Sequence, residues 1–319
     1  MSGAVHAAGD ELDRDNCIVP FSTVQSKAMG RLVRLGSVVD EILSRHNYPT
    51  PVSIVLGQAI ALTAMLGTTL KFDGDLVLQT KTDGPLGFLV VNFATPGQLR
   101  AHASFDADYI AKLGDTMTIN AGELIGKGYL ASSIDPGGGM VRYQGIVGLE
   151  GHGLSTAAHT YFRQSEQLPT FTKLSVARFR DRESGSQREQ WRAGGILLQH
   201  VTPVGGREHK DDEDDFLLGE EDDDWQRVEM LAQTVEDHEM VDPTLSPERL
   251  LYRLYHEEGV RASKERPLEV FCRCSEGRVQ NMLKSFRPED LEDLRDDDGQ
   301  VTVTCEFCNR SYSITLAET

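Results

Sequence analysis

Four of the five cysteines in this 319-residue chain fall within its last fifty residues, where they form two close pairs. Cys272 and Cys274 make a C-x-C pair, and after thirty intervening residues Cys305 and Cys308 make a C-x-x-C pair. Two thiol pairs separated by such a gap are typical of a four-thiolate zinc site. No histidine follows His256, so a mixed site of cysteine and histidine ligands is not expected in this segment.

The segment that carries these pairs is too short to fold securely on apolar burial alone. A structural zinc ion contributes roughly 10 to 16 kcal/mol to the folding of peptides of this kind. Between the pairs, Pro288, Leu291 and Leu294 indicate a helix, DDDG a turn, and VTVTC a strand that returns to the second pair. We therefore expect a small zinc module whose fold depends on its metal. Because the expected ligands are thiolates, which oxidants attack, oxidation would remove the groups that hold the metal and with them the order of the module.

Composition narrows the classes of partner. A formal net charge of -18 and a pI near 4.9 disfavour nucleic acid and anionic membrane surfaces, which are bound mainly through clustered Lys and Arg. Residues 1–16 have neither the basic nor the apolar region of a secretory signal, so we expect a cytoplasmic protein. In a reducing compartment, clustered thiols more often bind metal or perform redox chemistry than form permanent disulfides.

Residues 20–203 alternate between strand-like and helix-like stretches. Segments 76–80, 87–93 and 140–149 are rich in β-branched and aromatic residues, and turn signals bound them. The apolar run 53–70 is interrupted by Gln58, Thr63 and glycines and has about the minimum length of a membrane span, so we interpret it as a buried core helix. The expected fold class is α+β, with a sheet-rich core around a buried helix, a helical linker and a small C-terminal zinc module.

The composition changes after Pro203. Residues 207–224 are nearly all acidic around a short apolar triplet, and their charge density and glycine predict a mobile connector rather than a helix. Two amphipathic helices are expected next, at 225–237 and 246–259. Their apolar stripes consist of Val228, Leu231, Ala232 and Val235 in the first helix and of Leu250, Leu251, Leu254 and Tyr255 in the second. Both stripes need a surface on which to dock, most simply the preceding core.

Together with the cysteine pairs, a long series of motifs in one order resembles the redox-regulated 33 kDa chaperonin family, the heat shock protein 33 family. The resemblance covers nearly everything from about residue 18 to residue 316. The motifs that carry it are HNYPTPV (46–52), LKFDGD (70–75), DGPLGF (83–88), RYQGIVGLEG (142–151), YFRQSEQLPT (161–170), AGGILLQ (193–199) and LYRLYHEEGV (251–260).

This resemblance implies an ATP-independent holdase, a chaperone that binds unfolding client proteins and prevents their aggregation. Carried over one residue at a time, Cys272, Cys274, Cys305 and Cys308 match the family's zinc ligands and redox-switch cysteines. In the reduced, inactive form they would hold one Zn²⁺. Oxidation would form the disulfides Cys272–Cys274 and Cys305–Cys308, release zinc, unfold the module and loosen the linker, and clients would then bind, typically to a homodimer.

The chain is thus expected to have four parts. They are a flexible N-terminal extension (1–17), the α+β chaperone core (18–203), an acidic and helical linker (204–268) and the zinc and redox-switch module (269–319). The acidic insert and the acidic N-terminal extension depart from the family pattern and bear on the threshold of activation. Cys17 has no counterpart in the cysteine motif and is expected to be a bystander thiol.

Two other functions remain open from the residues alone. A thiol-disulfide oxidoreductase would place an accessible C-x-x-C at the start of a helix, whereas Cys305 follows a strand pattern. A zinc-ribbon module that binds nucleic acid fits the cysteine spacing loosely, but the acidity of the chain opposes it. We therefore expect a protein that is not an enzyme and that binds neither nucleic acid nor membrane.

Overall fold

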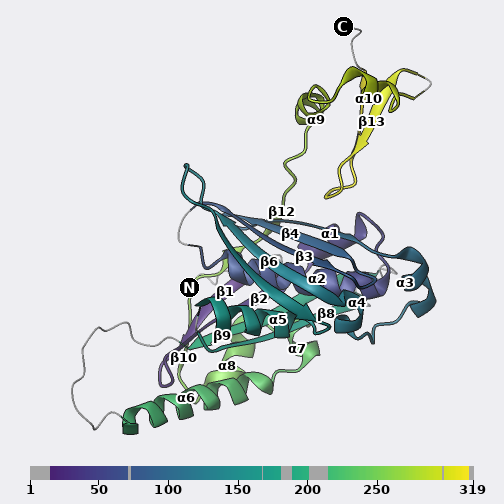
Figure 1. Ribbon diagram of the computed structural model, residues 1–319. Coiled ribbons are helices and arrows are strands. Elements are labelled where there is room, and N and C mark those ends of the chain that lie inside the picture. The colour runs from purple at the N-terminus through teal and green to yellow at the C-terminus, as the bar shows by residue number, and fades with distance from the viewer. Residues whose placement is uncertain are drawn as a thin grey trace, which may run out of the picture.

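The computed structural model describes residues 15–70, 73–166, 168–180, 189–200, 215–296 and 298–315. They form a sheet-rich core with a small module at the C-terminal end (Figure 1). The core contains two six-stranded sheets, with one helix enclosed between them and further helices packed around them. This is the α+β architecture that the sequence predicts.

The first sheet has the order β10-β1-β2-β9-β8, with β11 also paired to β1, and its strands are antiparallel. Its strands are β1 (Asn16–Thr23), β2 (Ala28–Leu35), β8 (Thr170–Arg180), β9 (Glu189–His200), β10 (Val260–Ala262) and β11 (Arg266–Pro267). Because β10 and β11 follow the linker helices in sequence, the end of the linker is hydrogen-bonded into the edge of the core sheet.

The second sheet has the order β12-β5-β4-β3-β6-β7, in which β12 pairs parallel to β5. Its strands are β3 (Asp75–Thr82), β4 (Phe88–Ala94), β5 (Gln98–Ser104), β6 (Lys127–Asp135), β7 (Tyr143–Glu150) and β12 (Glu269–Val270). The strands predicted at 76–80 and 87–93 are confirmed as β3 and β4. The third predicted strand begins only at Tyr143, because Gly137, Gly138 and Gly139 all have positive φ and make a loop before it.

Helix α2 (Thr50–Gly67) lies between the two sheets, as the apolar run predicts. Among the described helices it alone has the length and hydropathy of a membrane span, but 89% of that window is buried inside the core. Two glycines let neighbours approach it closely. A Cβ on Gly57 would lie 2.9 Å from Val176, and one on Gly67 would lie 2.2 Å from the Phe93 ring. The helix is therefore a core element.

Shorter helices surround this centre. They are α1 (Ser37–Ser44), α3 (Ala107–Leu113), α4 (Ala121–Ile125) and α5 (Leu154–Tyr161), and a π-helical turn at Phe162–Glu166 extends α5.

The linker forms three helices on the outer face of the first sheet (Figure 1). They are α6 (Asp215–Gln233), α7 (Asp237–Val241) and α8 (Pro247–Tyr255). Both predicted amphipathic helices are confirmed, and α8 starts with the expected cap, in which the Ser246 side chain accepts a hydrogen bond from the Arg249 N–H. Helix α7 was not predicted.

The prediction of a mobile, non-helical connector was wrong for residues 215–224, which form the first half of α6; residues 207–214 lie outside the described residues. A single glycine costs a helix only about 1 kcal/mol. The apolar stripe that begins at Trp225 then docks the second half of the helix.

The C-terminal module contains α9 (Glu276–Leu283), α10 (Pro288–Glu292) and a hairpin of β13 (Gln300–Thr304) and β14 (Ser311–Thr315). The predicted helix and strand between the cysteine pairs are confirmed as α10 and β13, and α9 was not predicted. Among the described residues the buried apolar cluster of the module is small: Val279, Leu283, Leu291, Val301 and Ile314.

Candidate metal centre and the covered face of the core

The β13–β14 hairpin positions the second cysteine pair. Cys305 and Cys308 lie in its loop, where the Cys305 N–H donates to the Arg310 carbonyl at 2.9 Å and the Asn309 N–H donates to the Cys305 carbonyl at 2.8 Å. Asn309 has φ +55°, a left-handed conformation that asparagine tolerates better than most residues. These backbone bonds turn both thiols toward the first pair.

The first pair lies in the turn that leads into α9. The Ser275 side chain caps this helix by accepting from the Arg278 N–H, and the Arg278 guanidinium donates to the Arg273 carbonyl at 2.9 Å. The helix start thereby fixes the loop that carries Cys272 and Cys274.

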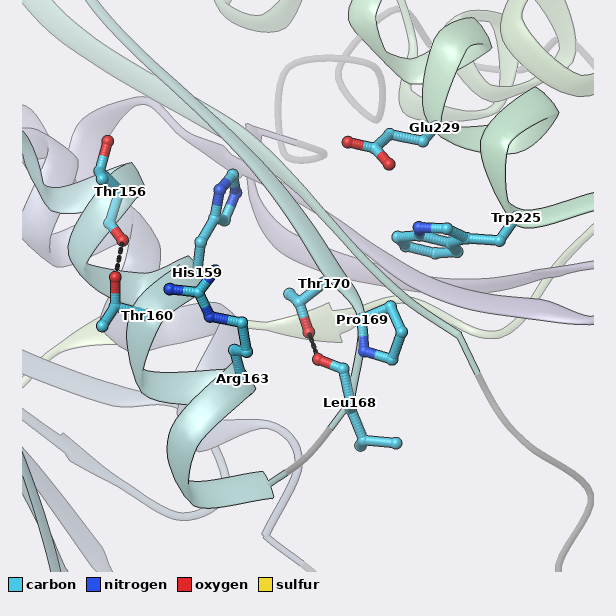
Figure 2. Close-up of a pocket in the computed structure, with 9 residues that line it drawn as sticks. All are labelled: Thr156, His159, Thr160, Arg163, Leu168, Pro169, Thr170, Trp225 and Glu229. Atoms are coloured by element: carbon cyan, nitrogen blue, oxygen red, sulfur yellow. Dashed lines mark hydrogen bonds between the residues drawn. The ribbon is translucent and has the colours of Figure 1, made fainter. Parts of the chain in front are cut away.

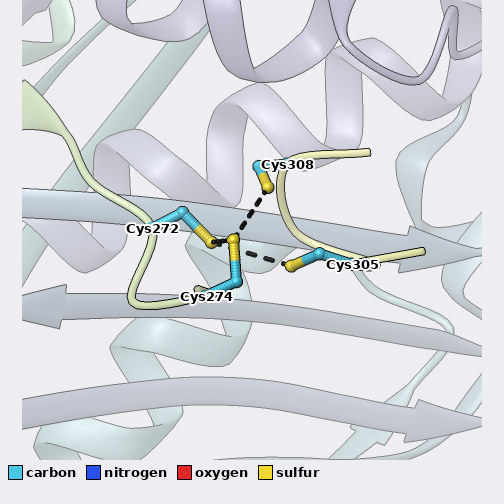
Figure 3. A group of neighbouring side chains, drawn as sticks. All are labelled: Cys272, Cys274, Cys305 and Cys308. Atoms are coloured by element: carbon cyan, nitrogen blue, oxygen red, sulfur yellow. Dashed lines mark hydrogen bonds between the residues drawn. The ribbon is translucent and has the colours of Figure 1, made fainter. Parts of the chain in front are cut away.

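The four sulfur atoms form a compact cluster (Figure 3), all within 4.8 Å of one another. The Sγ–Sγ distances are 3.3 Å from Cys272 to Cys274, 3.7 Å from Cys272 to Cys305 and 3.3 Å from Cys274 to Cys308. Four thiolates at about 2.3 Å from a tetrahedral zinc ion would be separated by about 3.8 Å. The cluster is close to that size, and its donors suit zinc, so these residues could hold a metal ion.

The thiols of the cluster differ in acidity. Burial alone would raise the pKa of Cys274, but hydrogen bonds from the Tyr312 hydroxyl at 3.2 Å and from the neighbouring thiols outweigh burial and lower that pKa to about 7. Burial raises the pKa of Cys308 to about 12 and also raises the pKa of Cys272. Without metal, Cys274 is therefore the most readily ionised of these three thiols. The sequence analysis missed Tyr312, which lies on β14 beside the cluster.

Both cysteine loops contact the core. The Arg273 guanidinium forms two bonds to the Asp75 carboxylate, at 2.9 and 2.5 Å. From the other loop, the Asn309 side chain donates to the Arg45 carbonyl at 2.8 Å. Arg100 lies over the Phe307 ring, 4.2 Å from its centroid. The loops that carry the thiols are thus also loops by which the module touches the core.

The second feature of the site is the outer face of the first sheet. Helices α6, α7 and α8 cover it and form with it an apolar cluster distinct from the central core. From the sheet the buried members are Cys17, Val19, Phe21, Ala28, Leu32, Phe171, Ile196 and Leu198; from the linker they are Trp225, Val228, Ala232, Val235, Met240, Leu250, Leu251, Leu254 and Tyr255. The predicted stripes therefore dock on the core. If the linker left, this apolar area would be open to solvent.

Cys17 belongs to this covered face rather than to the metal centre. It is 3% exposed, and burial raises the pKa of its thiol to about 12. It is not a member of the four-cysteine cluster.

A hollow of about 630 Å³ lies where α6 meets the core (Figure 2). Trp225 and Glu229 come from α6, and His159, Arg163 and Thr170 lie opposite them on the core. The His159 Nε2 atom accepts from the Thr172 N–H at 2.8 Å, and burial lowers the pKa of this imidazole. The hollow marks a place where the docked linker is less tightly packed on the core.

Comparison with known proteins gives a consistent picture. A sequence model of the family described as "Hsp33 protein" matches residues 16–315. A 33 kDa chaperonin from Caulobacter vibrioides is 40% identical over 301 residues, which cover 94% of this chain and 95% of the relative. A 33 kDa chaperonin from Escherichia coli is 34% identical over 283 residues, covering 89% and 86%.

A solved structure shares the fold. The crystal structure of a 33 kDa chaperonin (heat shock protein 33 homolog) from Thermotoga maritima superposes with a TM-score of 0.72 at 20% identity, covering 94% of this chain and 95% of that one.

Proposed function

Because this chain belongs to the Hsp33 protein family, it is a molecular chaperone rather than an enzyme, and we propose that it is a redox-regulated, ATP-independent holdase. The observation that carries the proposal is the cluster of four thiols within 4.8 Å of one another, in a module with a small apolar core of its own. The linker that covers an apolar face of the core provides the surface to be regulated.

In the reduced protein, Cys272, Cys274, Cys305 and Cys308 would ligate one Zn²⁺ as thiolates. A zinc ion bound there would supply a structural cross-link between the α9 turn and the β13–β14 loop. Such a cross-link compensates for the small apolar cluster of the module. The docked module and linker would then keep the covered face closed, which is the inactive state.

Oxidation would convert the four ligands into two disulfides. We propose the pairs Cys272–Cys274 and Cys305–Cys308. Each disulfide forms from two thiolates with loss of two electrons, which reduce hydrogen peroxide to two hydroxide ions or hypochlorous acid to chloride and hydroxide, and Zn²⁺ is released. The sulfur distances do not select this pairing over Cys274 with Cys308, at 3.3 Å, so the proposal of pairs rests on the family resemblance. Sulfur atoms joined in disulfides are poor metal ligands, and the module would lose its cross-link.

Loss of the cross-link would reach the linker through the chain. Cys272 lies two residues after the end of β12, and the chain before β12 forms β10 and β11 at the edge of the first sheet. When the module unfolds, Arg273 and Asn309 would no longer hold their partners on the core, and the linker helices would undock more readily. The face between β1 and β8 would then bind apolar segments of unfolding proteins.

The remaining assignments are part of the same proposal. We propose that residues 18–203 act as the chaperone core, 204–268 as the linker and 269–319 as the switch module. We further propose a cytoplasmic location, homodimerisation on activation, and no partnership with nucleic acid or membrane, for which the net charge of -18 is the support.

The test compares reduced, zinc-loaded protein with protein treated with hypochlorous acid, or with peroxide under mild heat. Aggregation of a heat-denatured client is followed by light scattering without ATP. Suppression by the oxidised protein alone supports the proposal, and equal suppression by the fully reduced protein contradicts it. Rapid turnover of a dithiol substrate by the zinc-free protein would instead indicate an oxidoreductase, and salt-sensitive RNA binding would indicate a nucleic-acid module.

A further inference from the structure

We propose that the outer face of the first sheet binds non-native polypeptide through a row of side-chain donors for backbone carbonyl oxygens, in addition to its apolar patch. This inference rests on the proposed holdase function and specifies how its clients are recognised. We call these donors, Arg34, Lys173, Ser175 and Arg192, the donor row. The linker segment from Val235 to Leu245 now occupies it.

Arg34 is the centre of the donor row. It lies on β2, is 1% exposed, and its guanidinium donates to three main-chain carbonyls of the linker. One bond, to Glu239, measures 3.3 Å, and the other two reach Asp242 and Leu245. Its Nε atom has no hydrogen-bond partner within the part of the chain that the structure describes. The linker therefore uses most, but not all, of the donors that this side chain offers.

Three further side chains, on the neighbouring strands, also donate hydrogen bonds to main-chain carbonyls of the linker. Arg192 of β9 donates from Nε to the Val241 carbonyl at 2.6 Å. On β8, Ser175 donates to the Asp237 carbonyl at 2.9 Å, and Lys173 donates to the Val235 carbonyl.

The linker backbone also lies unusually close to the sheet here. A Cβ added to Gly194 of β9 would lie 2.2 Å from the Met240 carbonyl oxygen, so only glycine permits this approach. The sheet is thus shaped for a main chain, rather than for side chains, at this position.

The donor row and the apolar patch lie on one face. On β2, Ala28 and Leu32 belong to the patch, and Arg34 lies two residues further on, on the same side of the strand. On β9, Ile196 and Leu198 belong to the patch, and Arg192 lies on the same side of that strand. The face is therefore apolar toward β1 and the Phe171 end of β8, and rich in donors around Arg34 and Arg192.

Each of these linker bonds ends on a main-chain oxygen, which every residue type carries. Recognition of this kind does not depend on the sequence of the bound segment. In folded proteins nearly all buried carbonyls are already paired, whereas an unfolding chain offers free carbonyls together with exposed apolar side chains. A face with both cationic donors and an apolar patch therefore fits non-native polypeptide and discriminates against folded proteins. Charge assistance strengthens hydrogen bonds from Arg and Lys.

The same donors would serve the linker in the reduced protein and the client in the oxidised protein. Removing one of them has two opposite consequences. It loosens the linker, which would raise the activity of reduced protein, and it weakens client binding by oxidised protein. A donor that served the linker alone would show only the first consequence.

The experiment measures binding of a permanently unfolded, carboxymethylated protein to the oxidised, zinc-free full chain by fluorescence anisotropy. Arg34→Met and Lys173→Met should each raise the dissociation constant about three- to tenfold. The matched control is Arg31→Met, which removes a positive charge from the same strand on the opposite face, where Arg31 bonds Gln199. The control should change the dissociation constant less than about twofold.

Nile red, a neutral apolar dye, separates the two parts of the face. Its binding to oxidised protein should not be weaker in either variant than in the parent protein, since every residue of the apolar patch is retained. Circular dichroism checks folding. If Arg34→Met does not fold, Lys173→Met carries the test, because its side chain is 32% exposed and its loss leaves the core packing intact.

Equal client affinity in Arg34→Met, Lys173→Met and the parent would overturn the donor row as a client site. So would an equal loss in Arg31→Met, because general charge would then explain the effect. If oxidised parent protein binds the unfolded client no better than reduced protein, the proposed function itself fails, and that outcome is recognisable without any variant.

Discussion

The core and the C-terminal module are stabilised in different ways. In the core, two sheets enclose α2, and side chains such as Leu56, Ile60 and Leu62 are fully buried from every direction. In the module, the described apolar cluster has five residues, and four thiols converge beside it. A region held by apolar burial is indifferent to oxidants, whereas a region held by thiolates is sensitive to them. Under the proposed function, this difference would let the module unfold on oxidation while the core stays folded.

The largest expected effect is removal of metal from the module. Chelation, or Cys305→Ser, should unfold the module, because a structural zinc contributes on the order of 10 kcal/mol to such small folds. Hydrogen exchange should lose protection at β13 and β14 and keep it at α2.

Cys17→Ser is the matched control, since Cys17 lies outside the cluster and within the covered face. It should leave zinc content and module protection unchanged. Unchanged zinc content in Cys305→Ser would show that this residue is not a ligand.

The opposite perturbation acts on the core. Ile60→Ala removes a fully buried side chain from α2 and should lower the free energy of unfolding by about 2 to 5 kcal/mol. The zinc stoichiometry of the folded protein should not change, and denaturant unfolding with a metal-release indicator measures both. Zinc release that shifts to lower denaturant concentration together with the loss of α2 protection would mean that the two regions are not as distinct as their packing indicates.

Much of this division could be predicted from the sequence. The buried helix, two of the predicted strands, the stripes of α6 and α8 and the grouping of the cysteines follow from local periodicity and spacing. Each of these features depends on residues that are close together in the sequence, so a local pattern is enough to predict it. The strands at the end of the linker were not predicted. β10, β11 and β12 are two or three residues long and form only because distant strands pair with them.

Contacts between the module and the core should have a smaller effect. Phe307→Ala removes the ring beneath Arg100, and Asp75→Asn removes the charge opposite Arg273. Both contacts are partly exposed, so each should weaken docking by about 0.5 to 1 kcal/mol. The expected result is faster zinc release during oxidation at unchanged zinc affinity before it. Arg287→Ala, which removes an ion pair with Asp290 inside the module, is the control and should not alter the rate.

The smallest expected effect is a pH dependence of the core. Burial lowers the pKa of His159 below its ordinary value near 6.5, against the opposing effect of Glu229. The unfolded chain then binds a proton that the folded chain does not, so stability should fall as pH drops below about 6.5 and stop falling below the folded pKa.

His159→Gln keeps an acceptor for the Thr172 N–H and should flatten the slope of thermal stability between about pH 7 and pH 5.5. His46, whose pKa burial also lowers, leaves a residual slope. An unaltered slope in the variant would remove His159 from the explanation.

The metal centre and the covered face differ in how far the sequence reveals them. Cysteine spacing identifies the four thiols, but not Tyr312, Asp75 or Phe307, which depend on how the module folds and docks. The role of Arg34 is only partly predictable from the sequence. It lies inside the strand AMGRLVRL, and a buried arginine needs partners for its charge. Those partners are carbonyls of residues more than two hundred positions away, which no local pattern encodes.

The most direct test follows three quantities in one sample during oxidation: zinc release, hydrogen exchange of α6 to α8, and suppression of client aggregation. The account predicts that zinc leaves first, that the linker helices lose protection while α2 keeps it, and that chaperone activity rises with the exposure of the linker-covered face. Activity that rises while α6 to α8 stay protected, or zinc loss that leaves the module ordered, would contradict it.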